Sequence, residues 1–191
     1  MIGGYYVAGL AGRATFDLFV RQLPATRNFL VTAGLEQALD FLESLRFTGE
    51  EIDFLRTVPA LANLPRAFFD DYLPAFRFTG DVWAIDEGTP VFAHEPIMRV
   101  TAPLAEAQLV ETALIAETMF PTSVASRAAR VIEAAAGRSV MEFGARRART
   151  VSTPASGRRA PPTSPALVRR PSSKRASASA FRCRERWHIH G

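Results

Sequence analysis

Two neighbouring arginines behind a predicted strand have the type and position best suited to binding an anion. Residues 139–143 have the pattern of a strand, which delivers Arg146 and Arg147 at its carboxyl end. A guanidinium is a planar fork that binds a phosphate or a carboxylate through two hydrogen bonds. Folds that combine helices and strands commonly bind ligands at this end of a strand. The spacing alone favours a solvated basic turn, so an anion site here needs further support.

Other polar residues could support that site or provide a second contact. Glu142, inside the same predicted strand, either supports one of the two arginines or occupies a strand edge, and Phe143 is grouped with it as a supporting residue. Arg27 offers an independent contact for an anion. Asn28 could belong to the same site, or its side chain could cap the helix expected to follow it. His94, in an Ala-His-Glu-Pro turn, is assigned no role.

The first half of the chain predicts elements that could position these residues. Residues 14–21 alternate between apolar and polar with period two, which predicts a strand. Residues 30–45 carry leucines and an alanine at helical spacing, which predicts an amphipathic helix. A capping-box pattern beginning at Thr48 opens a helix over residues 49–56. A further helix is expected to begin near Pro65, because proline suits a first helical turn.

The second half predicts short strands followed by helices. Strand candidates lie at residues 80–85, 90–93 and 97–101, separated by turn-like sequences. Two helices follow over residues 103–118 and 122–136, with a turn between them at Met-Phe-Pro. Together with the strand before the paired arginines, these elements predict an α/β fold for the body of the chain.

Composition limits the classes of protein that this chain of 191 residues can belong to. The apolar fraction of 48% is sufficient for a packed core. No apolar stretch is long enough to span a membrane, and the first residues lack the pattern of a secretory signal. We therefore expect a cytoplasmic protein. The single cysteine, Cys183, allows no internal disulfide and no metal site built from several cysteines.

Charge separates the body from the tail. Residues 1–148 hold 13 arginines against 18 acidic residues, a net charge of −5. Residues 149–191 hold ten basic residues against one acidic residue, a net charge of +9. This tail is rich in Arg, Ser, Pro and Ala and has few large apolar residues, so it cannot bury enough surface to offset chain entropy. We expect the tail to be disordered.

The body resembles the amino-terminal part of nicotinate phosphoribosyltransferases over residues from about 5 to 148. The resemblance rests on four separated segments in the same order: ATFDLFVRQLPATRNFLVTAGLEQALDFLESLRFT, FRFTGDVWAIDEGTPVFAHEPIMRV, LAEAQLVETALI and SVMEFGARRA. It implies an α+β amino-terminal domain over residues 1–102. Linking helices and the first strand of an irregular, here incomplete, α/β barrel would follow over residues 103–148. The disordered tail, 149–191, completes the expected organisation.

The resemblance also implies an activity. The family forms nicotinate mononucleotide from nicotinate and phosphoribosyl pyrophosphate in NAD salvage, with ATP hydrolysis and Mg²⁺, and it usually works as a homodimer. This reaction must hold several phosphate charges while pyrophosphate departs. With the resemblance, Arg146 or Arg147 is expected to bind a substrate phosphate or the nicotinate carboxylate. Arg27 and Asn28, in the family's RNF segment, are expected near the substrate. We expect this chain alone to be inactive.

The tail resembles the translation of a gene that is read in the wrong frame. Degenerate codons for the residues from Arg149 onward, read from the third base of the first codon, permit the string HGVDAG. The same offset applied to residues 179–191 permits GIPVSGTMAHSW. Both strings resemble segments of the family, and the second resembles the segment whose histidine accepts phosphate from ATP. We therefore hypothesise a lost or gained base between the codons of Ala148 and Arg149.

Two other classes of function remain open from sequence alone. The basic tail could bind a nucleic acid or another polyanion through its charge. However, its only aromatic residues are Phe181 and Trp187, so it lacks the interleaved aromatics on which bases stack. The acidic body could instead be a noncatalytic interaction module.

Overall fold

The computed structural model describes residues 1–141 and 185–188. The chain divides into two compact units, residues 1–126 with 181–191 and residues 127–180. Among the described residues, no helix is long and apolar enough to cross a lipid bilayer.

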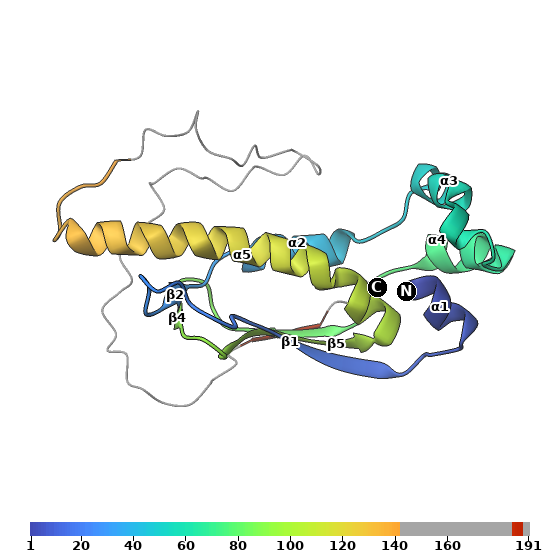
Figure 1. The fold of residues 1–191 in the computed structure, drawn as a ribbon, viewed down its shortest axis with the longest axis horizontal. Helices are drawn as coiled ribbons and strands as arrows, with labels where there is room; N and C mark the ends of the chain where they lie inside the picture. The colour runs from blue at the N-terminus through green and yellow to red at the C-terminus, as the bar shows by residue number, and fades with distance from the viewer. Residues whose placement is uncertain (142–184, 189–191) are drawn as a thin grey trace. The chain divides into compact units, whose positions relative to one another are not determined.

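The main sheet has four antiparallel strands in the order β1-β5-β3-β6 (Figure 1). Its strands are β1 (Arg13–Phe19), β3 (Asp81–Ala84), β5 (Pro96–Pro103) and β6 (Glu185–His188). A second sheet pairs β2 (Leu30–Val31) with β4 (Pro90–Val91). Helices combined with antiparallel sheets make an α+β fold, so the expected fold class is confirmed. The strands predicted at residues 14–21, 80–85, 90–93 and 97–101 are all present, with shifted ends.

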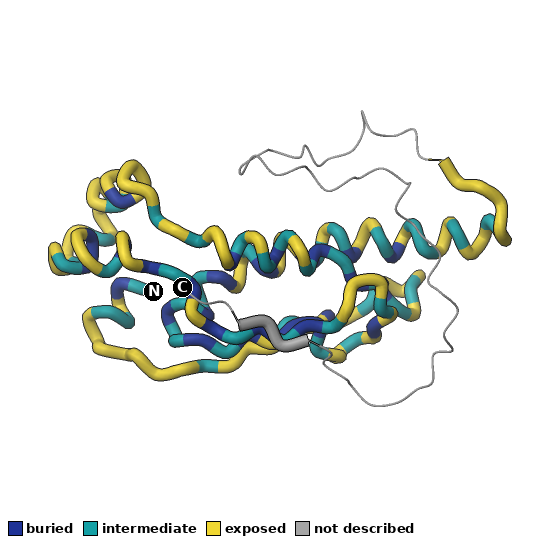
Figure 2. Tube along the Cα trace, turned by 180° about the vertical axis from the view of Figure 1, so that it is seen from behind, coloured by how far each residue is buried: buried dark blue, intermediate teal, exposed yellow. Residues whose placement is uncertain are grey.

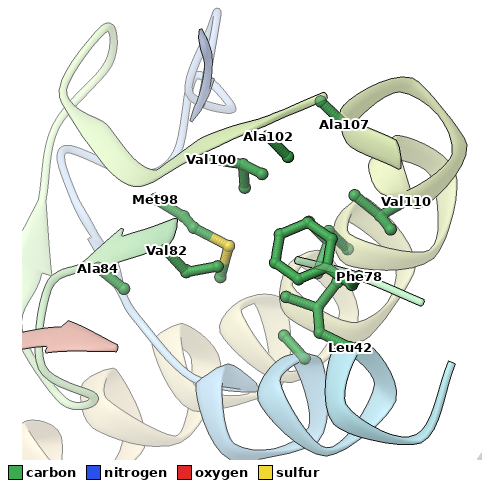
Figure 3. Packing of buried hydrophobic residues seen from close by; sticks show 11 residues of the cluster. Leu42, Phe78, Val82, Ala84, Met98, Val100, Ala102, Ala107 and Val110 are labelled. Carbon is green, nitrogen blue, oxygen red and sulfur yellow. The ribbon is translucent and has the colours of Figure 1, made fainter. Parts of the chain in front are cut away.

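Two helices cover one face of the main sheet and form the largest core. These are α2 (Leu35–Ser44) and α5 (Leu104–Ala134). Figure 3 shows the Phe78 ring between Met98 of β5 and the side chains of Leu42 and Val110 from the two helices. We call this group the main cluster; its buried members are Ala38, Leu42, Phe78, Val82, Ala84, Met98, Val100, Ala102, Ala107, Val110 and Leu114.

The opposite face of the main sheet carries polar pairs in register. Arg99 of β5 donates two hydrogen bonds to Asp17 of β1, at 2.6 and 2.9 Å. Thr15 and Thr101, which are opposite one another, share a hydrogen bond of 2.9 Å between their hydroxyls. This alternation of apolar and polar faces is what the period-two pattern of residues 14–21 predicts.

A smaller cluster is built from the helices before β3. It joins α1 (Ile2–Val7), α3 (Gly49–Thr57), the short 3₁₀-helix η1 (Pro59–Leu61), the π-helix η2 (Phe68–Tyr72) and α4 (Leu73–Ala75). The predicted capping box is confirmed. The hydroxyl of Thr48 accepts the backbone N–H of Glu51, and the carboxylate of Glu51 accepts the backbone N–H of Thr48. The helix expected near Pro65 is also present. Figure 2 shows α3 mostly exposed, whereas buried residues alternate with intermediate ones along β3 and much of β5.

Helix α5 is continuous where the sequence predicts two helices. The two segments predicted as helices, 103–118 and 122–136, fall almost wholly within one helix of 31 residues, Leu104–Ala134, with Pro121 inside it. Proline removes the hydrogen bond that its N–H would donate to the carbonyl of Glu117, four residues earlier. Tertiary packing on both sides of Pro121 keeps the helix intact, because Leu114 is buried in the main cluster and Ser126 bonds β2. The prediction of a turn is therefore wrong.

Three other expectations differ from the structure. The helix predicted over residues 30–45 begins only at Leu35, because residues 30–31 pair with β4 instead. Residues 139–141 of the strand predicted over 139–143 have no regular structure, and the remainder lies outside the described residues. Disorder is the wrong prediction for residues 185–188, which form β6. The rest of the tail lies outside the described residues.

Candidate functional site

The loop from Pro24 to Phe29 carries the two predicted site residues that the structure describes. It connects β1 to β2, and both of its ends are fixed in a small apolar cluster. Val20 and Leu23 hold the first end, and Leu30 holds the second. The buried members of this cluster are Val20, Leu30, Val91 and Ile97. The loop is thus short and attached firmly at each end.

The Arg27 side chain has no partner among the described residues. The backbone N–H of Arg27 donates to the carbonyl of Pro24 at 2.8 Å, which closes a turn. Its side chain is half-buried and forms no hydrogen bond or ion pair with the described residues. A guanidinium with unused donors that is partly shielded from water binds a phosphate or carboxylate more strongly than a fully solvated one. The geometry therefore suits the predicted role.

Asn28 is exposed and does not cap a helix. The residues after it enter β2, and α2 begins only at Leu35. The capping interpretation is therefore wrong. The side chain makes no hydrogen bond with the described residues, which leaves it available beside Arg27.

Hydroxyls on α5 hold the strand that follows the loop. Ser126 accepts the backbone N–H of Val31 at 2.8 Å. Thr122 accepts the N–H of Ala33 and donates to the carbonyl of the same residue, both at 3.1 Å. The other side of the strand faces residues 89–91, where the N–H of Thr32 donates to the carbonyl of Thr89 at 3.1 Å. Both edges of β2 and its extension are therefore occupied.

Glu87 supplies the cap at the start of α2. Its carboxylate accepts the backbone N–H groups of Gly34 and Leu35, at 2.6 and 2.7 Å. A carboxylate is favourable here because the amino end of a helix carries partial positive charge. Gly34 has a φ of 96°, and a Cβ on it would collide with the backbone of Glu117 and Thr118. Glycine at this position therefore lets the α2 start lie directly against α5.

The remaining predicted site residues cannot be placed. Glu142, Phe143, Arg146 and Arg147 lie outside the described residues.

His94, to which no role is assigned, has a φ of 67° and donates its backbone N–H to the carbonyl of Val20 at 2.8 Å. The contact helps fix the end of β1 before the loop.

A small cavity and an open groove are present among the described residues, and neither is lined by the candidate loop. The cavity of about 10 Å³, with room for roughly one water molecule, is lined by residues that include Thr32, Glu87 and Thr118. The open groove of about 260 Å³ lies beside Tyr72, Phe76 and Glu106. Burial raises the pKa of Glu106, and hydrogen bonds from Thr79 partly oppose that rise. Neither cavity is lined by Arg27 or Asn28.

The described part of the chain has no cluster of three His, Cys, Asp or Glu residues that could hold a metal ion. The carboxylate of Glu87 is engaged as the cap of α2. Since Mg²⁺ is usually bound by one or two carboxylates together with substrate phosphates, we assign no Mg²⁺ ligand among the described residues.

A sequence model described as the nicotinate phosphoribosyltransferase (NAPRTase) N-terminal domain matches residues 1–118. The chain belongs to the nicotinate phosphoribosyltransferase family. The expected family is thereby confirmed, and the candidate loop lies inside the matched residues. The match lies within the body and does not reach the basic tail, so it does not favour a nucleic-acid-binding protein that acts through the tail.

Individual relatives agree with this membership of the nicotinate phosphoribosyltransferase family. Nicotinate phosphoribosyltransferase pncB2 of Mycobacterium tuberculosis is 42% identical over 148 residues, which cover 78% of this chain and 31% of the relative. Nicotinate phosphoribosyltransferase of Bacillus subtilis is 40% identical over 151 residues, covering 78% and 29%. The crystal structure of human nicotinic acid phosphoribosyltransferase matches with a TM-score of 0.66 and 33% identity, over 74% of this chain and 28% of that one. The chain spans about a third of the length of these curated relatives.

Sequence reasoning missed the residues that hold the candidate loop in place. Thr122 and Ser126 bond the strand that follows the loop. Together with Thr118, whose hydroxyl bonds the carbonyl of Leu114 in its own helix, they recur every four residues along α5, and all three are buried. Hydroxyls at this spacing share one helix face, and such a stripe within an apolar helix is a detectable signal. The role of Glu87 has no comparable signal, because it depends on a contact between residues 52 or 53 positions apart.

Proposed function

We propose that this chain is the amino-terminal part of an enzyme that forms nicotinate mononucleotide from nicotinate and phosphoribosyl pyrophosphate, with ATP hydrolysis, in NAD salvage. The observation that carries the proposal is the family match over residues 1–118. The unused guanidinium of Arg27, on a loop fixed at both ends, supports it further. Since the chain spans about a third of its relatives' length, we expect these 191 residues alone to be inactive.

In this proposal Arg27 binds an anionic group of a substrate, either a phosphate or the nicotinate carboxylate. Asn28 adds a neutral hydrogen bond at the same place. Arg146 and Arg147 are proposed as further substrate contacts, with Glu142 and Phe143 in support. The value of such contacts lies in orientation, because fixing two reactants removes much of the entropic part of the barrier.

The proposal includes the family's other requirements. ATP would be hydrolysed with Mg²⁺, which neutralises phosphate charge when bound. No described residue is assigned a part in that chemistry, since none belongs to a cluster of three metal-binding side chains. We further propose a homodimer in the cytoplasm.

A turnover experiment with two versions of the gene tests the proposal. The gene would be expressed both as it stands and with the reading frame shifted after the codon of Ala148. We expect the shifted product to form nicotinate mononucleotide, detected by chromatography, and the unshifted chain to form none. Turnover by the unshifted chain would contradict the expected inactivity, and absence of turnover by a folded, shifted product would contradict the proposed function.

Variants of the active product then test Arg27. Arg27→Ala should raise the KM for phosphoribosyl pyrophosphate or for nicotinate about tenfold or more, since a charge-assisted hydrogen bond contributes about 1.5–3 kcal/mol. Arg66→Ala removes an exposed arginine from the smaller, helical cluster and serves as the control. Equal kinetic constants for the two variants would remove Arg27 from the substrate site.

A further inference from the structure

The outer edge of β3 is occupied by a segment from the far end of the chain. Residues 185–188 form β6, which runs antiparallel to β3 and places Val82 opposite Trp187 and Ala84 opposite Glu185. β3 is therefore an inner strand, with β5 on its other side. Figure 1 shows β6, in red, along this edge of the sheet.

One hydrogen bond just beyond the end of β3 shows toward which neighbouring strand each β3 residue points its backbone N–H and C=O groups. The N–H of Ile85 donates to the carbonyl of Ile97 at 3.1 Å, toward β5. Successive residues in an antiparallel strand point their N–H and C=O groups to opposite sides. The backbone groups of Trp83 therefore point toward β5, and those of Val82 and Ala84 point to the outer edge.

The same alternation shows which backbone groups of β6 face β3. Trp187 and Glu185 lie opposite the two residues whose groups point outward, so their backbone groups face β3. The N–H of Arg186 points away from the sheet. Only every second residue of this segment therefore contributes backbone hydrogen bonds to the contact.

We propose that the outer edge of β3 is a docking edge for an extended peptide segment, recognised through its backbone, and that residues 185–188 of this chain occupy it whatever the reading frame from which they come. An uncovered edge presents a row of free N–H and C=O groups and pairs readily with another strand. Here the edge residues Val82 and Ala84 also bury their side chains in the main cluster, so pairing at this edge is continuous with the core. The bound segment closes the sheet on this side.

The contact is short enough to be reversible. Four residues supply two outward-facing positions on β3, and each backbone hydrogen bond adds only about 0.5–1.5 kcal/mol net. We therefore expect the segment to leave the edge much more often than the sheet itself opens. The vacated edge fits an antiparallel, extended segment with a backbone N–H at alternate positions.

Amide hydrogen exchange in the full chain tests the proposal residue by residue. In the unaltered chain, the amides of Val82 and Ala84 should be protected. Trp187→Pro removes an N–H that faces β3, so these two amides should exchange at least about tenfold faster. The amide of Trp83, bonded toward β5, should keep its protection. Arg186→Pro is the matched control, because it removes an N–H that points away from the sheet.

Rescue in trans completes the test and separates displacement from misfolding. A labelled peptide spanning residues 181–191 should bind the Trp187→Pro variant and restore protection of Val82 and Ala84. Fast exchange of both amides in the unaltered chain would overturn the proposal, and this measurement needs no variant to fold. Unchanged exchange of the Val82 and Ala84 amides in Trp187→Pro would also overturn it. So would equal effects of the two proline variants on these amides while the Trp83 amide stays protected. Exchange of the segment between differently labelled copies would assign the occupant to a second chain and reject the same-chain assignment.

Discussion

The hydroxyl of Thr122 satisfies both polar backbone groups of Ala33, accepting its N–H and donating to its carbonyl oxygen at 3.1 Å each. Thr122 is only 1% exposed, so water cannot easily replace these bonds. The contact links the middle of α5 to the chain that leaves the candidate loop. It is thus part of what holds that loop in its position.

Thr122→Val should destabilise the chain more than its size suggests. Valine keeps the shape of threonine but leaves two backbone groups of Ala33 without partners, at about 1–3 kcal/mol for each buried group. Thr112→Val, at an exposed position of the same helix, should change stability by no more than about 0.5 kcal/mol. The free energies of unfolding from urea titration check both values. Similar values for the two variants would mean that the Thr122 contact does not stabilise the fold.

Gly34→Ala should be among the most damaging single substitutions in the described chain. The position has a φ of 96°, and its Cβ would meet the backbone of α5 and not a flexible side chain. Left-handed strain and this collision together predict a loss of about 2 kcal/mol or more. Gly49→Ala, in the first turn of α3 with open space around it, should be neutral or slightly stabilising. Thermal unfolding of both variants tells them apart, and a mild effect at Gly34 would disprove the close packing described.

Asp17→Asn should alter the pH dependence of stability on the acid side. The hydrogen bond from Arg99 lowers the pKa of Asp17 below 3.8, so the folded state favours the ionised carboxylate. The contribution of the ionised Asp17 to the free energy of unfolding is therefore fully present above the carboxyl's ordinary pKa. It is lost as the pH falls through the lowered pKa of the folded state. The pair is exposed, so the difference at neutral pH should be at most about 1 kcal/mol. Unfolding curves between pH 7 and pH 2, roughly the range over which such a carboxylate titrates, should converge for the two proteins at the acid end.

An exposed carboxylate of α2 supplies the control for that measurement. Asp40→Asn removes a charge that forms no ion pair within the described residues. It should lower stability less than Asp17→Asn at neutral pH. If the two substitutions gave the same pH profile, the bond between Asp17 and Arg99 would not be the cause.

The nucleotide sequence gives a direct test of the tail hypothesis. Read from the third base of the Arg149 codon, the gene should encode a string such as HGVDAG immediately and a string such as GIPVSGTMAHSW at the codons of residues 179–191. Resequencing from the codon of Arg146 onward would also show whether the shift is present in the gene itself. A shifted reading that lacks both strings would end the frameshift hypothesis.

Local signals predicted much of the fold. The capping box at Thr48 and the apolar stripe of α2 depend on residues three or four apart, so the sequence alone contains them. The strand pattern of residues 14–21 was equally local, because one sheet face is buried and the other is polar. Family resemblance, carried by ordered segments, predicted the membership that the comparisons confirm.

Contacts between distant segments could not be predicted in the same way. Pro121 indicated a helix break, but packing of α5 against the sheet and against β2 outweighs the lost hydrogen bond. The start of α2 was misplaced because residues 30–31 find their partner some 60 positions later, at residues 90–91. The composition of the tail indicated disorder, whereas backbone pairing at residues 185–188 depends little on composition. At the candidate site, Arg27 and Asn28 are candidates that the sequence alone suggests, whereas the hydroxyls that fix the strand after their loop were missed.

The unbroken course of α5 has a mechanical consequence. Val110 and Leu114 fix the helix to the main sheet, and the hydroxyls of Thr122 and Ser126 fix β2 to the same helix. Sliding of β2 along α5 would break several buried hydrogen bonds at once, so the two move together. The position of the Arg27 loop therefore depends on a helix that it precedes by some eighty residues, and distortion of α5 would weaken the anion contact proposed for Arg27 without touching that residue.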